Sequence, residues 1–114
     1  MVIPKSVTSI VSGTFSGCKK LTSVVIPEGV TSIGKCVFGG CSSLTSVVIP
    51  KGVTFIGYEA FRGCGALTSV VIPPSVTSFY QFIFFECENL TIHAPAGSNA
   101  EAYAKENNIP FVAE

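Results

Sequence analysis

The chain has 114 residues, enough for one domain, and its charges exclude the usual electrostatic partners. Seven Lys and Arg balance seven acidic residues and only 12% of the residues are charged, so nothing directs the chain to nucleic acid or an anionic membrane. The most apolar run, 79–85, contains Gln81 and is far shorter than the roughly 18 residues of a membrane-inserted helix. We find no signal-peptide pattern after Met1.

Internal repetition is the strongest signal in the chain. The string Leu-Thr-Ser-Val-Val-Ile-Pro begins at Leu21, Leu44 and Leu67, each 23 residues after the last, with a truncated copy at 2–4 and a degenerate one at 90–92. Further positions keep the same period and form four columns: Val7, Val30, Val53 and Val76; Ile10, Ile33, Ile56 and Phe79; Phe15, Phe38, Phe61 and Phe84; Cys18, Cys41, Cys64 and Cys87.

Each repeat is predicted to form one coil of a right-handed, mainly β solenoid of the leucine-rich-repeat kind. Leu21, Val24 and Ile26 approach the period-two spacing of a strand with one buried face, and Pro27 ends that strand. A turn at 28–29 leads to a second extended piece at 30–33, and a tight helical or 3₁₀ turn then brings residues 37–41 back inward. Since one coil cannot bury its own apolar side, coils must stack about 4.8 Å apart.

The repeat resembles a known family. The segment from Leu44 to Cys64 closely resembles the BspA-like class of leucine-rich repeats, with its Ile-Pro, Ile-Gly, Ala-Phe and Gly-Cys pairs at the expected offsets, and the resemblance covers the whole chain. It implies a secreted or cell-surface protein of a bacterium or protist, engaged in adhesion and binding a protein partner such as a host or extracellular protein.

Two parts are expected along the chain. Residues 1–89 form the repeats, with a partial first coil and then coils at 21–43, 44–66 and 67–89, and residues 90–114 form a C-terminal cap. In the cap, Ser98 and Glu101 make a capping box for a helix at 100–107, and 109–112 reads as an extended tail. Met1 falls partway through a strand, so we expect a longer natural chain or a second copy covering this end.

The cysteines are expected to be structural. Those of the Cys18 column would stack with parallel Cβ vectors, which disfavours disulfides and favours buried free thiols. Cys36 lies outside that column and has three readings: an exposed reactive thiol, an intermolecular bridge, or a half-buried inert group. Cys36 and Cys41 have a C-x₄-C spacing, but without a second ligand pair we expect no metal.

No catalytic or cofactor site is expected. His93 is the single histidine and has no nucleophile of distinctive context near it, the glutamates are scattered, and each glycine serves a turn of the repeat. Asn89 begins an Asn-Leu-Thr sequon, which chance explains.

Two surfaces are candidates for binding a partner. The first, the strand face, is the outward side of the main strands; it is flat and uncharged and consists of Ser23, Val25, Ser46, Val48, Ser69 and Val71. The second, the aromatic patch, gathers rings that depart from the repeat; it consists of Phe55, Tyr58, Tyr80, Phe82 and Phe85. Either the patch is an interface or the cap buries it.

These features predict a non-enzymatic interaction or adhesion module of a secreted or surface protein. The alternative is a structural spacer or self-assembly module that forms a homodimer through the aromatic coil or the uncapped first coil.

Overall fold

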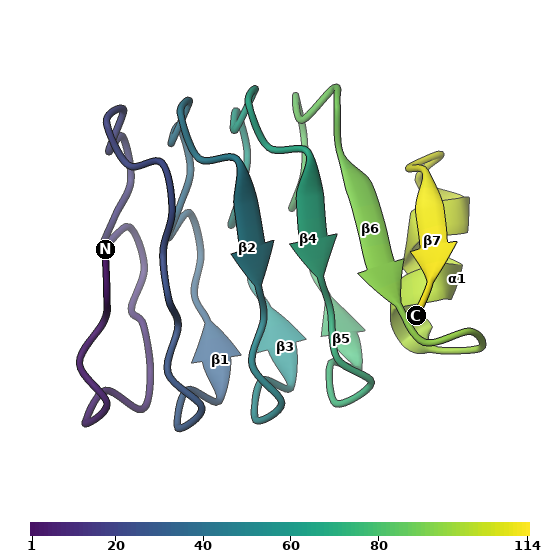
Figure 1. Ribbon diagram of the computed structural model, residues 1–114, viewed down its shortest axis with the longest axis horizontal. Coiled ribbons are helices and arrows are strands. Elements are labelled where there is room, and N and C mark those ends of the chain that lie inside the picture. The colour runs from purple at the N-terminus through teal and green to yellow at the C-terminus, as the bar shows by residue number, and fades with distance from the viewer.

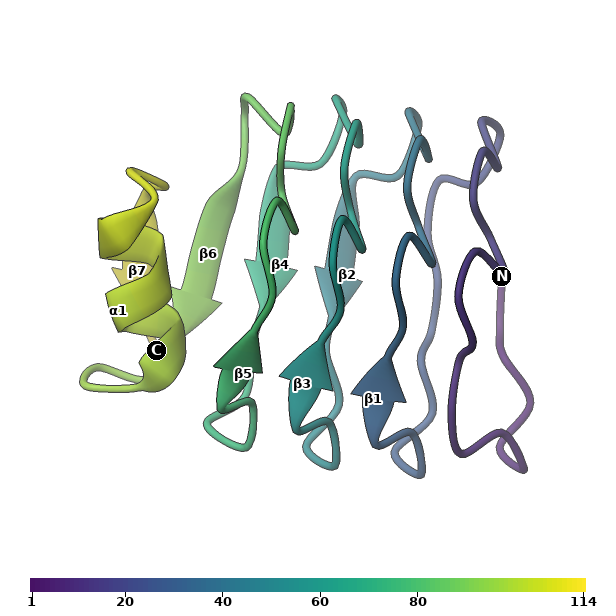
Figure 2. The ribbon, with the colours of Figure 1, turned by 180° about the vertical axis from the view of Figure 1, so that it is seen from behind.

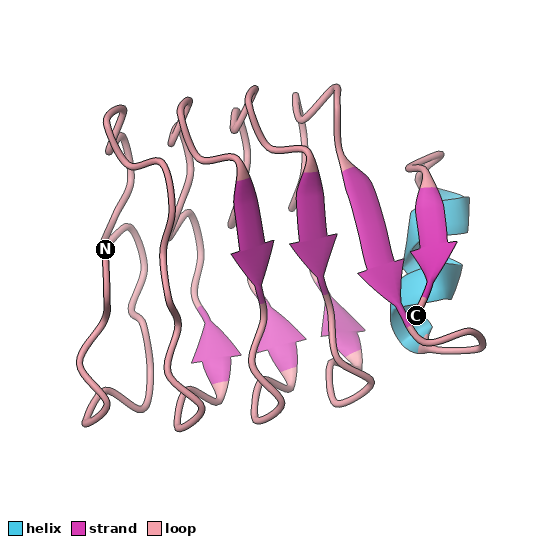
Figure 3. Ribbon diagram, viewed as in Figure 1, coloured by secondary structure: helices cyan, strands magenta, loops and turns pink.

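The computed structural model describes residues 1–114 and shows a chain wound into about four stacked turns (Figure 1). Two parallel sheets run along opposite sides of the stack. The main sheet contains β2 (Ser46–Val48), β4 (Ser69–Val71), β6 (Thr91–Ala94) and β7 (Phe111–Ala113), in that order. The second sheet contains β1 (Ser32–Ile33), β3 (Phe55–Ile56) and β5 (Ser78–Phe79). Turns connect them, and one helix, α1 (Asn99–Glu106), follows β6 (Figure 3).

The strand register reproduces the 23-residue period. Ser46 pairs with Ser69 between β2 and β4, and Ile33 pairs with Ile56 between β1 and β3. Isolated bridges such as that between Val2 and Val25 continue the pairing into the first coils. The predicted parallel solenoid is therefore confirmed, whereas its right-handed sense stays a prediction.

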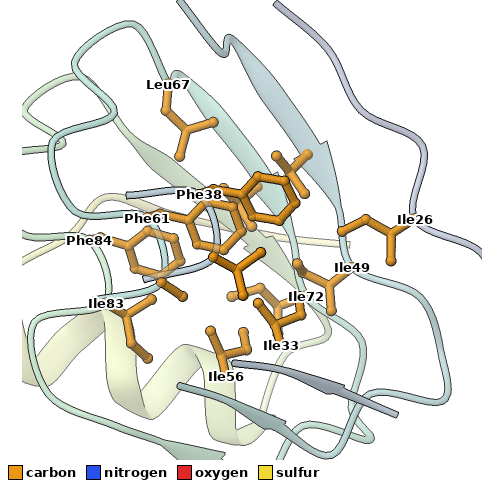
Figure 4. Packing of buried hydrophobic residues seen from close by; sticks show 14 of the residues in the cluster. Ile26, Ile33, Phe38, Ile49, Ile56, Phe61, Leu67, Ile72, Ile83 and Phe84 are labelled. Carbon is orange, nitrogen blue, oxygen red and sulfur yellow. The ribbon is translucent and has the colours of Figure 1, made fainter. Parts of the chain in front are cut away.

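The interior is a set of continuous side-chain ladders. Phe15, Phe38, Phe61 and Phe84 stack with ring centroids 5.5, 5.2 and 5.5 Å apart and planes within 12° of parallel. Figure 4 shows three of these rings in a row, beside isoleucines contributed by successive coils. No buried residue is polar or charged, so the side chains of the interior stabilise the fold mainly through apolar burial.

The segment that returns each coil to the main sheet differs from its prediction, because it forms turns without a helix. Cys36 and Gly40 have φ values of 57° and 75°, which a right-handed helix cannot accommodate. Alternate N–H groups also point out of the coil: those of Cys36, Phe38 and Gly40 donate to carbonyls of the next coil at 3.0, 2.8 and 2.7 Å. The N–H groups of Gly39 and Cys41 between them donate within the coil to the carbonyls of Cys36 and Phe38, so single turns form in place of a continuous 3₁₀ helix.

The C-terminal segment closes the far end of the stack. The Ser98 hydroxyl accepts from the Glu101 N–H at 3.3 Å and caps α1, as predicted, while the Glu101 carboxylate accepts from the Gly97 N–H instead of the Ser98 N–H. Tyr103 of α1 stacks on Phe79 at 4.7 Å, and β7 adds a parallel strand to β6. With eight residues, α1 lacks the length and apolar character of a membrane-crossing helix.

Glu101 makes the cap sensitive to pH. Its carboxylate accepts from the Gly97 N–H at 2.6 Å and pairs with Lys105 at 2.9 Å, and these contacts, in that order, lower the pKa of Glu101. A lowered pKa stabilises the folded chain above the unfolded carboxyl value of about 4.3, and the contribution is lost as pH falls through the lower folded value. Melting temperatures of the wild type and E101Q should therefore differ at neutral pH and draw together as the pH falls from about 4.3 through the lower folded value. A constant gap across that range would contradict the assignment.

The opposite end is open. Val7, Phe15 and Leu21 are partly buried, although the residues 23 and 46 positions further along in the same columns are fully buried or nearly so. The first coil is held by Met1, whose ammonium group donates to the Ser23 carbonyl at 3.1 Å. A hollow of about 470 Å³, lined largely by apolar side chains of residues 1–15, remains on its outer side.

Candidate binding surfaces

The strand face is exposed along most of its length. Val25 and Val48 are 58% and 62% exposed, and Val71, nearer the cap, is half-buried. The register places Val71 beside His93 and His93 beside Val112, so the apolar row continues onto the cap. The outward serines Ser23, Ser46 and Ser69 lie in the neighbouring row, and their side chains make no hydrogen bond. The structure thus brings all six predicted residues onto one flat surface.

Threonines at the edge of this face serve the fold. The hydroxyls of Thr45 and Thr68 donate to the main-chain carbonyls of Thr22 and Thr45, one coil earlier, at 3.3 and 3.2 Å. The 23-residue period does not predict these hydrogen bonds, because any side chain could repeat with that period. A threonine hydroxyl at the edge of each coil is the sequence feature that could have predicted them.

The aromatic patch remains at the surface. Tyr80, Phe82 and Phe85 are 54%, 51% and 48% exposed, and Phe55 and Tyr58 are half-buried. The reading in which the cap buries the patch is wrong for these three rings, because Tyr103 packs on Phe79 and Phe84 instead.

The aromatic patch consists of two groups of rings, and the rings within each group are in contact. A basic side chain lies over one ring in each of two places. Phe55 stacks on Tyr80 at 5.8 Å, and Phe82 meets both Tyr58 and Phe85 edge to face at 5.7 Å. Two cations lie over the rings: the Lys35 ammonium is 5.8 Å from the centre of the Tyr58 ring, and the Arg62 guanidinium is 5.3 Å from the centre of the Phe85 ring. Arg62 also pairs with Glu59 and, at 3.8 Å, with Glu86. The sequence reasoning missed these cations, although both sit one coil before the ring that they cover.

The cysteines of the Cys18 column occupy equivalent positions in successive coils. The Sγ atoms of Cys41, Cys64 and Cys87 donate to the carbonyls of Phe15, Phe38 and Phe61 at 3.2, 3.1 and 3.0 Å, and all five cysteines are free. Burial raises the pKa of Cys41, and the adjoining Cys87 thiol together with burial raises the pKa of Cys64. The Cys41 and Cys64 thiols are therefore poor nucleophiles, whereas the hydrogen bond with the Cys64 thiol lowers the pKa of Cys87.

The remaining candidates for chemistry are isolated. Cys36 is half-buried, with Sγ 3.7 Å from a Glu59 carboxylate oxygen, so its predicted half-burial is observed and its inertness stays a prediction. His93 is half-buried in β6, with Nδ1 3.7 Å from Glu114, and Asn89 is exposed in a turn. No three His, Cys, Asp or Glu side chains gather in a geometry that could hold a metal ion.

The stacked 23-residue coils, the parallel sheets and the internal phenylalanine ladder define a leucine-rich-repeat solenoid. The model of the BspA-type leucine-rich repeat region, with six copies, matches residues 1–106, and the chain belongs to this family. This repeat family and fold are generally non-enzymatic. The comparison with curated proteins found no match.

Solved structures of bacterial proteins are similar to this chain. A leucine-rich repeat protein from Bacteroides ovatus is 38% identical, with a TM-score of 0.75, over 80% of this chain and 24% of that one. A leucine-rich cell surface protein from Faecalibacterium prausnitzii is 30% identical, with a TM-score of 0.71, over 91% of this chain and 34% of that one. A leucine-rich repeat protein from T. pallidum is 25% identical, with a TM-score of 0.61, over 82% and 57%. The chain therefore spans only a part of these relatives.

Proposed function

We propose that this chain is a non-enzymatic protein–protein interaction module of a secreted or cell-surface adhesion protein and that it binds its partner through the strand face. The observation that carries the proposal is the row of exposed valines on a rigid parallel sheet. Such a surface offers apolar area with few charges to desolvate, which suits contact with another protein.

The comparisons support the setting of this proposal. The family is typically one of surface and adhesion proteins, and the F. prausnitzii relative is described as a cell surface protein. An extracellular or surface location places the exposed valines where a host or matrix protein can meet them.

The test is a triple substitution on the strand face. V25K, V48K and V71K together place three charges on one row without touching a buried side chain, so folding should be retained. Binding to immobilised extracellular-matrix and serum proteins should fall at least tenfold relative to the wild type, because charges at the centre of an apolar interface are desolvated. A matched control replaces Ser6, Ser12 and Ser42, which are exposed in turns, with lysine and so adds the same three charges. Unchanged binding by the valine variant would rule out the strand face.

A second candidate function is self-assembly, which the half-exposed rings of the aromatic patch favour. A homodimer through Phe82 and Phe85 would bury apolar area that the monomer leaves in water. Sedimentation equilibrium distinguishes the two functions: a monomer at all concentrations excludes this one, and a dimer abolished by F82S and F85S supports it.

A further inference from the structure

Each coil presents three main-chain N–H groups to the next coil along its turn segment. In the first coil the N–H groups of Gly13, Phe15 and Gly17 donate at 2.9, 2.9 and 2.7 Å to the carbonyls of Lys35, Val37 and Gly39. The third coil repeats the pattern: Glu59, Phe61 and Gly63 donate at 3.1, 2.9 and 2.8 Å to Gln81, Ile83 and Phe85. The acceptors are always the carbonyls of residues i, i+2 and i+4 of one segment.

The last coil presents the same three donors to no acceptor. The N–H groups of Phe82, Phe84 and Glu86 make no hydrogen bond within the chain. The cap continues the main sheet with β6 and β7, and α1 covers Phe79 and Phe84 from the interior side, but no segment of the cap pairs with the turn segment (Figure 2). This leaves a row of donors whose spacing matches that of a peptide backbone.

A hollow lies directly beside these donors. It has a volume of about 520 Å³ and separates the turn segment from the end of α1. We call it the end groove; its apolar lining comes from both sides and consists of Phe82, Phe84, Phe85, Leu90, Tyr103 and Ile109. Glu86 and Glu88 stand at its rim and give it negative charge.

We propose that the end groove binds a short peptide segment of another protein by main-chain addition, the segment being turned as residues 81–85 are against the third coil. Carbonyls at alternate positions of the segment accept from Phe82, Phe84 and Glu86, as those of each following coil do elsewhere. An apolar side chain between the second and third carbonyls enters the hollow, and a basic side chain at the last position lies beside Glu86, as Arg62 does within the fold. The partner is therefore a peptide with apolar and basic residues.

A second copy of the chain fits this groove less well. The first coil offers matching free carbonyls at Ser12, Thr14 and Ser16. However, β6 and β7 project two strands beyond the turn segment, about 10 Å at the spacing of paired strands, so the flat end of another copy meets the cap before it reaches the donors. A single short segment passes beside the cap.

The probe for the test is a synthetic peptide with the sequence of residues 57–63, blocked at both ends. In the fold its carbonyls at Tyr58, Ala60 and Arg62 accept the same kind of bonds, from the preceding coil. A second probe replaces the amide after Ala60 with an ester, whose carbonyl is a weaker acceptor. Titration of the full chain, followed by fluorescence anisotropy, should show binding of the amide and about five- to tenfold weaker binding of the ester.

Two variants of the protein locate the binding. E88W fills the groove from an exposed turn, and S42W places the same ring on the same exposed turn two coils earlier, away from the groove. With melting temperatures like that of the wild type, E88W should bind the probe at least tenfold more weakly and S42W equally well. The strand-face variant should bind it normally, so this result is independent of the proposed function.

Three outcomes would overturn the proposal. They are no binding of the amide probe up to about 1 mM, equal affinity for the amide and ester probes, and equal affinity of E88W and the wild type. Head-to-tail association of the chain that excludes the probe would assign the groove to a second copy instead.

Discussion

Replacing Phe61 with alanine should destabilise the chain by about 3–5 kcal/mol. Phe61 is completely buried and stacks on a phenylalanine at each side, Phe38 at 5.2 Å and Phe84 at 5.5 Å, so its removal leaves a cavity between two rigid coils. A domain of this size is stable by only about 5–15 kcal/mol, and the variant should unfold at a much lower urea concentration with an unchanged dependence on urea.

Phe15 is the matched control for this prediction. It belongs to the same ladder but stacks on one neighbour only and is partly exposed at the open end. Its replacement with alanine should cost about 1–2 kcal/mol. Equal losses at Phe15 and Phe61 would show that the ladder does not act through stacking between coils.

Adding one methyl group at Gly57 should destabilise the chain by about 3 kcal/mol, at the upper end of the range for overpacking. A Cβ atom there would lie 2.7 Å from the Gly34 carbonyl carbon and 2.8 Å from the Lys35 nitrogen, and backbone atoms of a neighbouring coil cannot rotate aside. Gly65→Ala is the control, since nothing lies within 4 Å of its Cβ, and it should change stability by less than about 0.5 kcal/mol.

Urea denaturation of G57A and G65A measures the two effects. The corresponding position of the last full coil is Tyr80, where the N–H donates to the preceding coil at 3.2 Å, compared with 2.7 Å for Gly57, so the two coils lie farther apart there. Similar stability of G57A and G65A would contradict the close approach of the second and third coils.

The period made the fold predictable from the sequence. Residues that repeat every 23 positions, such as Cys41 and Cys64, must occupy equivalent places in successive coils, so the columns and the parallel pairing followed from the period. The cap helix after Ser98 followed from a separate signal, the capping box that Ser98 makes with Glu101. The returning turn was described wrongly because its conformation depends on left-handed residues. Glycine at 13 suggests such a residue, but Cys36, Glu59 and Phe82 at the same position hide it.

The binding surfaces were only partly predictable. Alternation along a strand shows that Val48 points outward, but it cannot show how far Val71 is covered by the cap. The exposure of Phe82 and Phe85 depends on where α1 packs. Tyr103 of α1 stacks on Phe79, and no repeating pattern in the sequence predicts this tertiary contact. The main-chain N–H groups of the last coil are free because no further coil stacks on its turn segment, and only the structure shows this.

The central claim is that coils are stable because they share one interior in a 23-residue phase, and deletion of whole and partial coils tests it most directly. Removing residues 44–66 joins Ser43 to Leu67 and keeps every column in step, whereas removing only 44–55 takes out β2 and puts the columns out of step. Urea denaturation followed by circular dichroism should show a cooperative transition for the larger deletion, with lower stability than the wild type, and none for the smaller one. A half-coil deletion as stable as the full-coil deletion would contradict the account.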